Sequence, residues 1–218
     1  MAVLVWNQTG EKLYETGVKK GVLYPLSSDN KYTPGVAWNG LTSVSLSPEG
    51  ADVEAIYADD VKYMNLISTE ELNGTIEAYM SPEEFDACDG AADLATGVSI
   101  GQQSRKTFGL CFRTTVANDV TGVDYGYKLH LVYGCLASPS ERSFETINDS
   151  PEAMTLSWEF STTPVNVAGH KPTALVTIDS TKVDATKLKA LEDILYGTDS
   201  EEARLPLPDE IATLFAAG

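Results

Sequence analysis

Apolar and polar residues alternate with a period of two from about residue 36 to residue 180. This period is typical of β-strands that turn one face toward a core. The clearest segment is 155–161, where Leu156, Trp158 and Phe160 alternate with polar residues. The run 125–136 is apolar on both faces, which predicts a strand covered on both sides. Further strands are predicted at 41–47, 52–58, 61–68, 72–80, 107–116 and 173–179.

Three segments carry helical signals instead. Residues 81–84 read Ser-Pro-Glu-Glu, a capping box with Pro at the first helical position, and an Asp-Gly pair ends this short helix at residue 90. Residues 184–196 have an apolar stripe at helical spacing, with Asp184 at the start and Gly197 as the stop. A last short helix is predicted over 208–217.

These elements predict a mainly β fold, in which two antiparallel sheets pack as a sandwich or barrel with a flanking α-helix. We divide the chain into an N-terminal arm (1–34), a β-sandwich domain (35–196) and a C-terminal extension (197–218). Residues 197–207 have the composition of a linker, so we expect the terminal helix to dock on a neighbouring molecule.

The chain is strongly acidic. Its 218 residues include 15 Lys and Arg and 32 Asp and Glu, which gives a net charge of −17. Residues 37–104 hold thirteen acids against one base, Lys62. Tight binding to free nucleic acid needs clustered cations, so the charge argues against it. The hydrophobic fraction of 43% is that of a folded protein and excludes a disordered chain.

The three cysteines, Cys88, Cys111 and Cys135, are widely spaced and form no Cys-x-x-Cys pair. This excludes a zinc ribbon or a thioredoxin-like redox site and predicts free, buried thiols in a reducing cytoplasm. The apolar start of the chain is too short for a signal peptide. No apolar run reaches the length of a membrane span, so we expect no membrane-spanning segment.

Catalytic and metal-binding patterns are weak. His130 lies within a predicted strand, where a structural role is expected, and His170 lies in a loop. The pairs Asp59-Asp60 and Asp86/Asp89 lack further ligands at a spacing that a metal ion requires. No nucleophile elbow, phosphate loop or zinc-protease motif occurs. We therefore predict no enzyme activity, no catalytic residue, no metal and no cofactor.

Two classes of function remain open from the residues alone. Sheets leave edges that must be covered or paired, and pairing between copies produces a self-assembling shell or tube. The alternative is a monomeric binding sandwich, such as a carbohydrate-binding module that stacks sugars on Trp6, Trp38 or Trp158. Trp158 alternates with core residues, which favours a place in the core.

One set of motifs decides between a self-assembling protein and a monomeric binding sandwich. A Pro-Gly at 34–35 precedes a strand that ends in Pro48-Glu49-Gly50, and Tyr57-Ala58-Asp59-Asp60 follows, with Tyr63 just beyond. Related blocks are Asn-Gly-Thr-Ile-Glu-Ala at 73–78, Ser-Pro-Glu-Glu-Phe at 81–85, the aromatic alternation at 106–112, Tyr-Gly-Cys-Leu-Ala-Ser-Pro at 133–139, Glu-Thr at 145–146 and Thr-Leu-Ser at 155–157. Over residues 20–196 the chain closely resembles the major tail proteins, or tail tube proteins, of long-tailed bacteriophages. The two ends of the chain match nothing in that pattern.

The resemblance implies a structural subunit that forms stacked hexameric rings, with the inner sheets of a ring joined into one β-barrel. An N-terminal segment and a long loop or hairpin would reach the next ring. The tube would conduct the viral genome into the host and would meet tape-measure, tail terminator and tail tip proteins. The chain would be assembled in the host cytoplasm and would belong to the virion. The tubes of phage-derived contractile injection and secretion machines share this architecture and are the alternative.

DNA that passes such a tube must not adhere to it, and an acidic wall repels phosphates within a Debye length of roughly 8–10 Å. We place the acid-rich stretch 49–93 in the ring barrel and expect Asp52, Glu54 and Glu77 to face the lumen. Asp59-Asp60 is expected to be a turn that a stacking ring contacts.

The N-terminal arm, with Lys12, Lys19, Lys20 and Lys31, is expected to become ordered when rings stack. Segments 91–105 and 138–153 are the other candidates for contact between rings.

Overall fold

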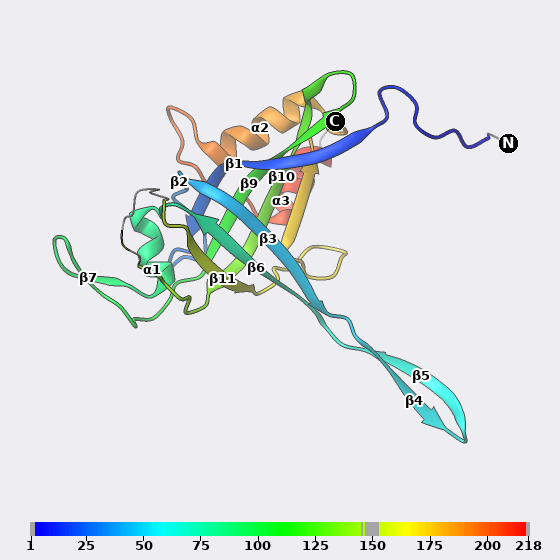
Figure 1. Ribbon diagram of the computed structural model, residues 1–218, viewed down its shortest axis with the longest axis horizontal. Coiled ribbons are helices and arrows are strands. Elements are labelled where there is room, and N and C mark those ends of the chain that lie inside the picture. The colour runs from blue at the N-terminus through cyan, green and yellow to red at the C-terminus, as the bar shows by residue number, and fades with distance from the viewer. Residues whose placement is uncertain (1–2, 145, 147–152, 217–218) are drawn as a thin grey trace.

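The computed structural model describes residues 3–144, 146 and 153–216 and is dominated by one curled antiparallel sheet (Figure 1). Its eight strands include a path in the order β2-β1-β9-β10-β11-β6-β3, with β12 paired to β10 beside that path. The strands are β1 (Leu13–Pro25), β2 (Val36–Trp38), β3 (Leu41–Gly50), β6 (Glu70–Ala78), β9 (Phe108–Asn118), β10 (Gly122–Ala137), β11 (Leu156–Thr162) and β12 (Leu175–Asp179). The predicted mainly β, antiparallel class with a flanking helix is confirmed, and the two packed layers are two parts of this one sheet.

The first core lies inside the curl of the sheet. Side chains from β1, β2, β6, β9, β10 and β11 meet there, and Phe85 covers one end. Trp158 packs edge-on against Trp38 and Phe85, with ring centroids 5.7 and 5.2 Å apart. The two ends of the sheet approach each other, because Leu41 of β3 lies against Gly21 of β1. Curling thus allows one sheet to bury an aromatic core without a second sheet.

The second core lies on the opposite face of the same sheet, beneath α2 (Ala185–Tyr196) and α3 (Pro208–Ala216). Leu129, Leu131 and Tyr133 of β10 point into it, while Val132 of the same strand points into the first core. The prediction that this strand is covered on both sides is therefore confirmed.

Both chain ends differ from the predicted domain boundaries. The N-terminal arm predicted over 1–34 is wrong in extent, because β1 pairs with β9 and β2 and buries Leu23 and Tyr24. The described residues that precede β1 are 3–12. The extension predicted over 197–218 is not peripheral either, because Leu205 and Ile211 are buried in the second core. Leu23 and Tyr24 in the first segment, and Leu205 and Ile211 in the second, are thus covered by the chain itself rather than by a neighbour.

The predicted helices are present with one change. A 3-10 turn, η1 (Glu83–Phe85), and α1 (Asp86–Asp89) replace the predicted short helix, and Gly90 ends α1 in the left-handed conformation as expected. The predicted capping box is wrong, because no side chain caps the start of η1. Helix α2 begins as predicted, with Asp184 Oδ1 accepting hydrogen bonds from the backbone N–H groups of Thr186 and Lys187 at 2.9 and 3.0 Å.

Replacing Asp184 with alanine removes both of these hydrogen bonds while the rest of α2 keeps its packing. We expect Asp184→Ala to lower the free energy of unfolding by about 1 kcal/mol, the usual cost of losing an N-cap side chain. Urea denaturation followed by circular dichroism measures this change. Asp199→Ala, at an exposed loop position, is the control and should leave the midpoint unchanged.

Candidate assembly surfaces

The part of the sheet formed by β3, β6 and β11 has a polar outer surface. Strands β3, β6 and β11 lie side by side, and the alternation that sends Ile76, Trp158 and Phe160 into the first core sends polar residues outward. We call this the polar face, and it consists of Ser43, Ser45, Ser47 and Glu49 of β3, Glu71, Asn73, Thr75 and Glu77 of β6, and Ser157, Glu159 and Ser161 of β11. None of these residues is basic, so the face is hydrophilic and negatively charged.

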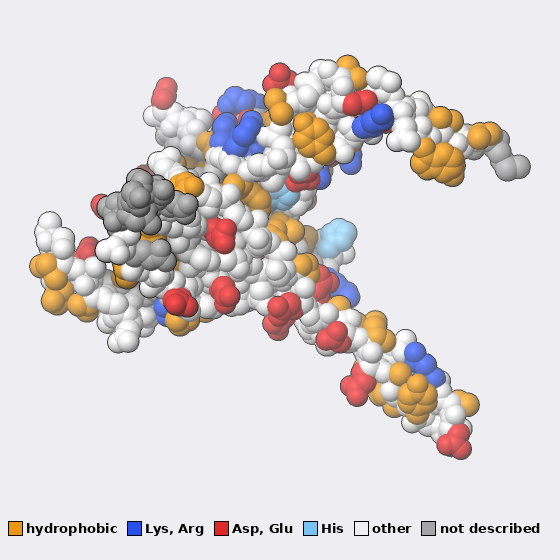
Figure 2. Space-filling view, in the orientation of Figure 1, with side chains coloured by type: hydrophobic (Ala, Val, Ile, Leu, Met, Phe, Trp, Pro, Cys, Tyr) orange, Lys and Arg blue, Asp and Glu red, His pale blue; other side chains and the backbone are white. Residues whose placement is uncertain are grey.

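The acids of the polar face are not neutralised across the strands. Glu49 and Glu71 lie directly opposite each other in the β3–β6 register, a like-charge pair that weakens strand pairing. Asn73 donates a hydrogen bond from Nδ2 to Glu49 Oε2 at 3.0 Å, which holds one carboxylate in place. Figure 2 shows acidic side chains spread over β3, β6 and β11, whereas basic side chains gather above them, toward β1 and α2. The sheet thus presents a surface that repels polyanions.

Strand β3 is an open edge of the sheet. It ends the strand order and pairs with β6 alone along its ladder. Residues 41–48 carry no charged side chain, and charge is one of the usual devices that prevent edge-to-edge pairing. By contrast, β1 is protected by two register irregularities around Lys19 and by Lys20 beside it. Residues 41–47 of β3 are therefore an uncharged edge that can pair with another strand.

A second sheet-like feature projects from this edge. β3 and β6 continue into a separate two-stranded ladder, β4 (Val53–Ala58) and β5 (Val61–Ile67), which extends well beyond the sheet (Figure 1). Gly50 has a positive φ of 79°, and a Cβ there would lie 2.3 Å from the carbonyl oxygen of Thr69. Glycine is required where this ribbon bends. The projection, here called the β4–β5 hairpin, is exposed except at Ala55 and Ile56, which are half-buried.

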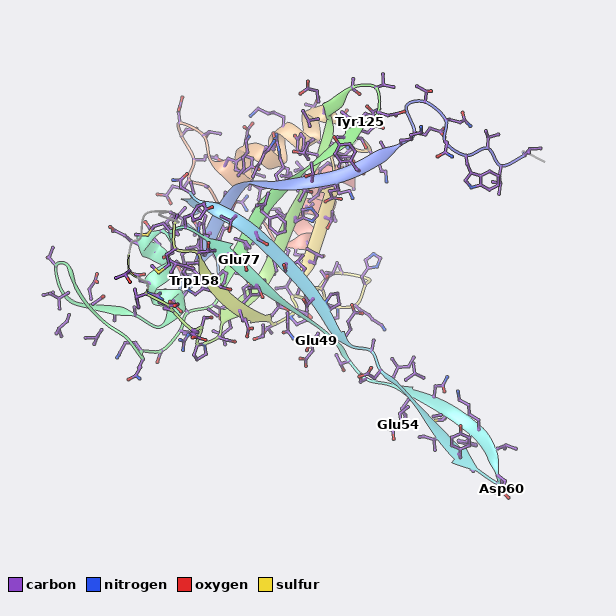
Figure 3. The ribbon with its side chains drawn as sticks, in the orientation of Figure 1. Glu49, Glu54, Asp60, Glu77, Tyr125 and Trp158 are labelled. Carbon is purple, nitrogen blue, oxygen red and sulfur yellow. The ribbon has the colours of Figure 1, made fainter. Side chains whose placement is uncertain are left out.

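The three predicted lumen residues fall in two different places. Glu77 lies on the polar face, opposite Ser43 and Ser157. Glu54 lies in β4 of the projecting hairpin and Asp52 directly precedes β4, so both are in a ladder separate from the sheet that holds Glu77. Figure 3 shows Glu77, Glu49, Glu54 and Asp60 following one another along the ribbon from the sheet to its tip. That any of them faces a lumen stays a prediction.

The motif residues of the sequence mark the parts of this ribbon. Pro48, Glu49 and Gly50 end β3, and Tyr57 and Ala58 lie near the outer end of β4. Asp59 and Asp60 form the predicted turn, both with positive φ (51° and 61°), which is typical of a tight two-residue hairpin turn. The motif therefore encodes a long hairpin with an acidic tip.

The four lysines of the predicted arm are held at several places. Lys19 and Lys20 lie within β1, and the Lys20 ammonium sits 4.9 Å from the ring centre of Tyr196 in α2. Lys12 directly precedes β1, and the carbonyl of Lys31 accepts a hydrogen bond from Ser27 N–H in the loop after β1. The expectation that they lie on one free segment is wrong, because β1 and its following loop are part of the sheet.

A polar cluster fixes the first half of β1. Glu15 forms an ion pair with Lys128 at 2.5 Å and lies 3.3 Å from His130 Nε2, which is 2.9 Å from Thr114 Oγ1. The His130 ring stacks on Phe112, and its Nδ1 lies 3.4 Å from Thr177 Oγ1. Burial lowers the pKa of His130, although Glu15 opposes this effect. Burial alone would raise the pKa of Glu15, but hydrogen bonds from Lys128 and Thr114 lower it. These contacts fit the structural role expected of His130.

The lowered pKa of His130 makes stability depend on pH. As the pH falls below about 6.5, the ordinary histidine value, the unfolded chain binds the proton first and the free energy of unfolding decreases. We expect His130→Gln, which keeps a polar group among the same partners, to reduce this loss between about pH 7.5 and about pH 5.5. Urea midpoints at the two pH values measure it. His170→Gln, in an exposed loop, should keep the wild-type pH dependence.

Sequence reasoning missed two acids of the polar face, Glu71 and Glu159. Glu159 alternates with core residues in its predicted strand and Glu71 directly precedes the predicted strand 72–80, but only the register of β6 with β3 and β11 places both on the same face as Glu77. Trp38 and Trp158 are buried and unable to stack on a sugar, whereas Trp6 is 74% exposed. The carbohydrate-binding alternative therefore loses two of its three tryptophans.

The described residues offer little else for ligand chemistry. Across 3–144, 146 and 153–216, no three His, Cys, Asp or Glu side chains cluster as metal ligands would. The three cysteines are free and buried, as predicted, and burial raises the pKa of each thiol.

Among the described residues, no helix combines the length and apolar character needed to cross a membrane. Of the other predicted contact segments, 91–105 is described, whereas 145 and 147–152 of the loop 138–153 lie outside the described residues.

Comparisons with known proteins give matches among solved structures alone. No protein-family model and no curated protein matches the chain. Among solved structures, it is similar to a chain in the cryo-EM structure of an extracellular contractile injection system, the PVC sheath–tube complex in its extended state. The two chains share 14% identity at a TM-score of 0.32, over 73% of this chain and 88% of that one. At this identity and score, the match is a likeness only.

Proposed function

We propose that this chain is a structural subunit of a phage-tail-like tube. The observation that carries the proposal is the polar face, an acidic and base-free sheet surface that ends at the open β3 edge. Pairing at such an edge joins copies into a larger sheet, and a contact that repeats head to tail gives a ring or a filament. The sequence resemblance to tail tube proteins supports the same arrangement.

In its specific form, the proposal is that six copies close a ring and that stacked rings make the tube of a long-tailed phage. The polar face lines the lumen, and the genome passes without adhering because carboxylates repel its phosphates. Tape-measure, tail terminator and tail tip proteins are the proposed partners, and the virion is the proposed location. The tube of a phage-derived contractile injection or secretion machine is the alternative, in which the lumen carries a different cargo.

Electron microscopy of the purified full chain tests the proposal directly. Negative staining over a range of protein and salt concentrations should show rings or hollow tubes, and light scattering should give a mass of several subunits. A chain that stays monomeric under all of these conditions, without rings or tubes, contradicts the proposal. Salt matters because each copy carries a net charge of −17, whose repulsion salt screens.

Reversing charge on the polar face tests which surface lines the lumen. Wild-type tubes are expected to leave duplex DNA unbound, whereas Glu77→Lys/Glu159→Lys tubes should retain it at low salt and release it at high salt. A gel-shift or filter-binding assay of tubes measures retention. The control is Glu77→Gln/Glu159→Gln, which removes the acids without adding cations and should not retain DNA as strongly. Equal retention by the Lys and Gln variants would place these residues away from any path open to DNA.

A further inference from the structure

Asparagine followed by glycine is the dipeptide most prone to spontaneous deamidation, and the chain contains it twice, as Asn39-Gly40 and Asn73-Gly74. The reaction begins when the backbone nitrogen of the glycine attacks the side-chain amide carbon of the asparagine. Glycine favours this attack because it has no side chain to block the approach and its backbone is conformationally free. Whether each pair reacts therefore depends on how firmly the fold holds its backbone.

The first pair, Asn39-Gly40, forms the exposed turn that joins β2 to β3. Gly40 has a positive φ of 79°, which explains why a glycine follows the asparagine at this turn. The carbonyl of Gly40 accepts a hydrogen bond from Tyr79 N–H at 2.9 Å. Within the described part of the chain, however, neither the Asn39 side chain nor the Gly40 N–H makes a hydrogen bond. Both reacting groups are thus free and open to water.

The second pair, Asn73-Gly74, is held inside β6 between two neighbouring strands. Gly74 is buried and pairs with Leu46 of β3 on one side and with Phe160 of β11 on the other. Asn73 donates a hydrogen bond from Nδ2 to Glu49 Oε2 at 3.0 Å, which engages the nitrogen that would have to leave. Ring closure would disrupt both ladders here, so this pair reacts only when the sheet opens locally.

We propose that Asn39 is a deamidation site in the native protein and that Asn73 is protected. The Gly40 nitrogen loses its proton to a base in the solvent and forms a bond to Asn39 Cγ. The Cγ–Nδ2 bond then breaks, and Nδ2 leaves as ammonia. Water opens the resulting cyclic imide on one side to give aspartate, or on the other side to give isoaspartate, in which the chain runs through the side chain. The reaction consumes water and needs no oxidant, reductant or enzyme.

Both products place a new carboxylate beside the open β3 edge. The turn directly precedes residues 41–47, which carry no charge in the unmodified chain. A charge beside an edge strand opposes its pairing with another strand. This consequence rests on the proposed function, because it concerns the edge through which copies are proposed to join. A subunit that ages before it assembles would then pair less readily than a new one.

Isoaspartate also lengthens the backbone between two anchored residues. Trp38, directly before the turn, is 3% exposed, and its Nε1–H donates to the carbonyl of Met80 at 2.9 Å. Leu41, directly after the turn, packs against the first core and lies against Gly21. An additional backbone carbon between these residues strains the turn. Isoaspartate therefore destabilises this end of the first core, whereas aspartate, which keeps the normal backbone, does not.

Peptide mapping of the native full chain by mass spectrometry tests the modification site. Trypsin cleaves after Lys31 and Lys62, and Asn39 is the sole asparagine of the peptide between them. During incubation at mildly alkaline pH, we expect Asn39 to convert at least roughly tenfold faster than Asn73. In urea, where both pairs are unfolded, the two rates should become similar. Equal rates in the native protein would overturn the proposal.

Urea denaturation separates the effects of the two products. Aged wild-type protein should unfold at a lower urea concentration than fresh protein, in step with its isoaspartate content. Fresh Asn39→Asp should stay close to fresh wild type, because it adds the charge without lengthening the backbone. Aged Asn39→Gln should keep its midpoint, because glutamine cyclises far more slowly. Converted wild-type protein with an unchanged midpoint would refute the effect assigned to the longer backbone.

Assembly of fresh variants tests the effect on the β3 edge. Asn39→Asp should need a roughly tenfold higher protein concentration to form rings or tubes than Asn166→Asp, which adds the same charge in the exposed loop between β11 and β12. Assembly of both variants at one concentration removes the effect on the edge and leaves the proposed function standing. A wild-type chain that never assembles overturns the proposed function, while peptide mapping still decides the deamidation site.

Discussion

Replacing Trp158 with alanine is expected to lower the free energy of unfolding by about 3–5 kcal/mol, the range for a buried aromatic side chain. Trp158 is 1% exposed at the centre of the first core, in contact with Trp38 and Phe85. Its Nε1 also lies 3.2 Å from Asp89 Oδ2, so the truncation removes a hydrogen bond that joins β11 to α1. The cavity left behind adds to the cost, because the neighbours come from several strands and relax only in part.

Urea denaturation with circular dichroism detection measures the loss at Trp158. Trp6→Ala is the matched control, since it removes the same side chain from an exposed position, and we expect a change within about 0.5 kcal/mol. Trp158→Ala with wild-type stability would show that this aromatic cluster is not packed as described. Near-ultraviolet circular dichroism of the variant should also change, because Trp158 and Trp38 adjoin.

Removing the β4–β5 hairpin is expected to abolish stacking while the subunit stays folded. Gly50 and Glu70 lie directly opposite each other, so an Asn-Gly turn inserted in place of residues 51–69 closes the β3–β6 ladder with a favoured hairpin geometry. The deleted residues belong to neither core, and we therefore expect the free energy of unfolding to change by less than about 1 kcal/mol. The resemblance to tail tube proteins assigns contact with the next ring to a long hairpin of this kind, so tubes should not form.

Negative staining distinguishes the outcomes for this shortened chain. Separate rings or single subunits are expected, with a circular dichroism spectrum and urea midpoint close to the wild type. A matched variant, Val120→Thr/Val123→Thr, reduces exposed apolar surface on another hairpin and should assemble normally. Tubes of wild-type length from the shortened chain would show that the hairpin has no part in stacking.

The alternation of apolar and polar residues predicted several strands correctly. Where the alternation is as regular as in residues 156–160, it indicates a strand without information about distant residues. No strand was predicted over the residues of β1, and the reason is physical. Gly17, Lys19 and Lys20 interrupt its alternation, and the two irregularities in its register allow those residues to be exposed within a strand. Pattern also does not tell which sheet a strand joins. β4 and β5 were correctly predicted as strands, but their separation from the sheet depends on the bend at Gly50.

The candidate surfaces needed tertiary information for the same reason. Glu77 was predicted from its place in a strand, whereas Glu159 becomes part of the same surface only through pairing between residues far apart in the chain. The C-terminal helix was predicted from its apolar spacing, but not its docking site. That site is built by β10 and α2, and periodicity within residues 208–217 carries no information about it.

The second core binds early and late parts of the chain to one another. Tyr24 donates its hydroxyl hydrogen bond to the carbonyl of Leu195 at 2.6 Å, and Tyr32 pairs with Leu205. The second face of β1 is therefore fully covered only after residues up to Ile211 have been synthesised and have left the ribosome. The β3 edge and the β4–β5 hairpin are made much earlier. A nascent chain thus exposes its most adhesive elements before its core is complete, and neighbouring chains on one messenger would meet at those elements first.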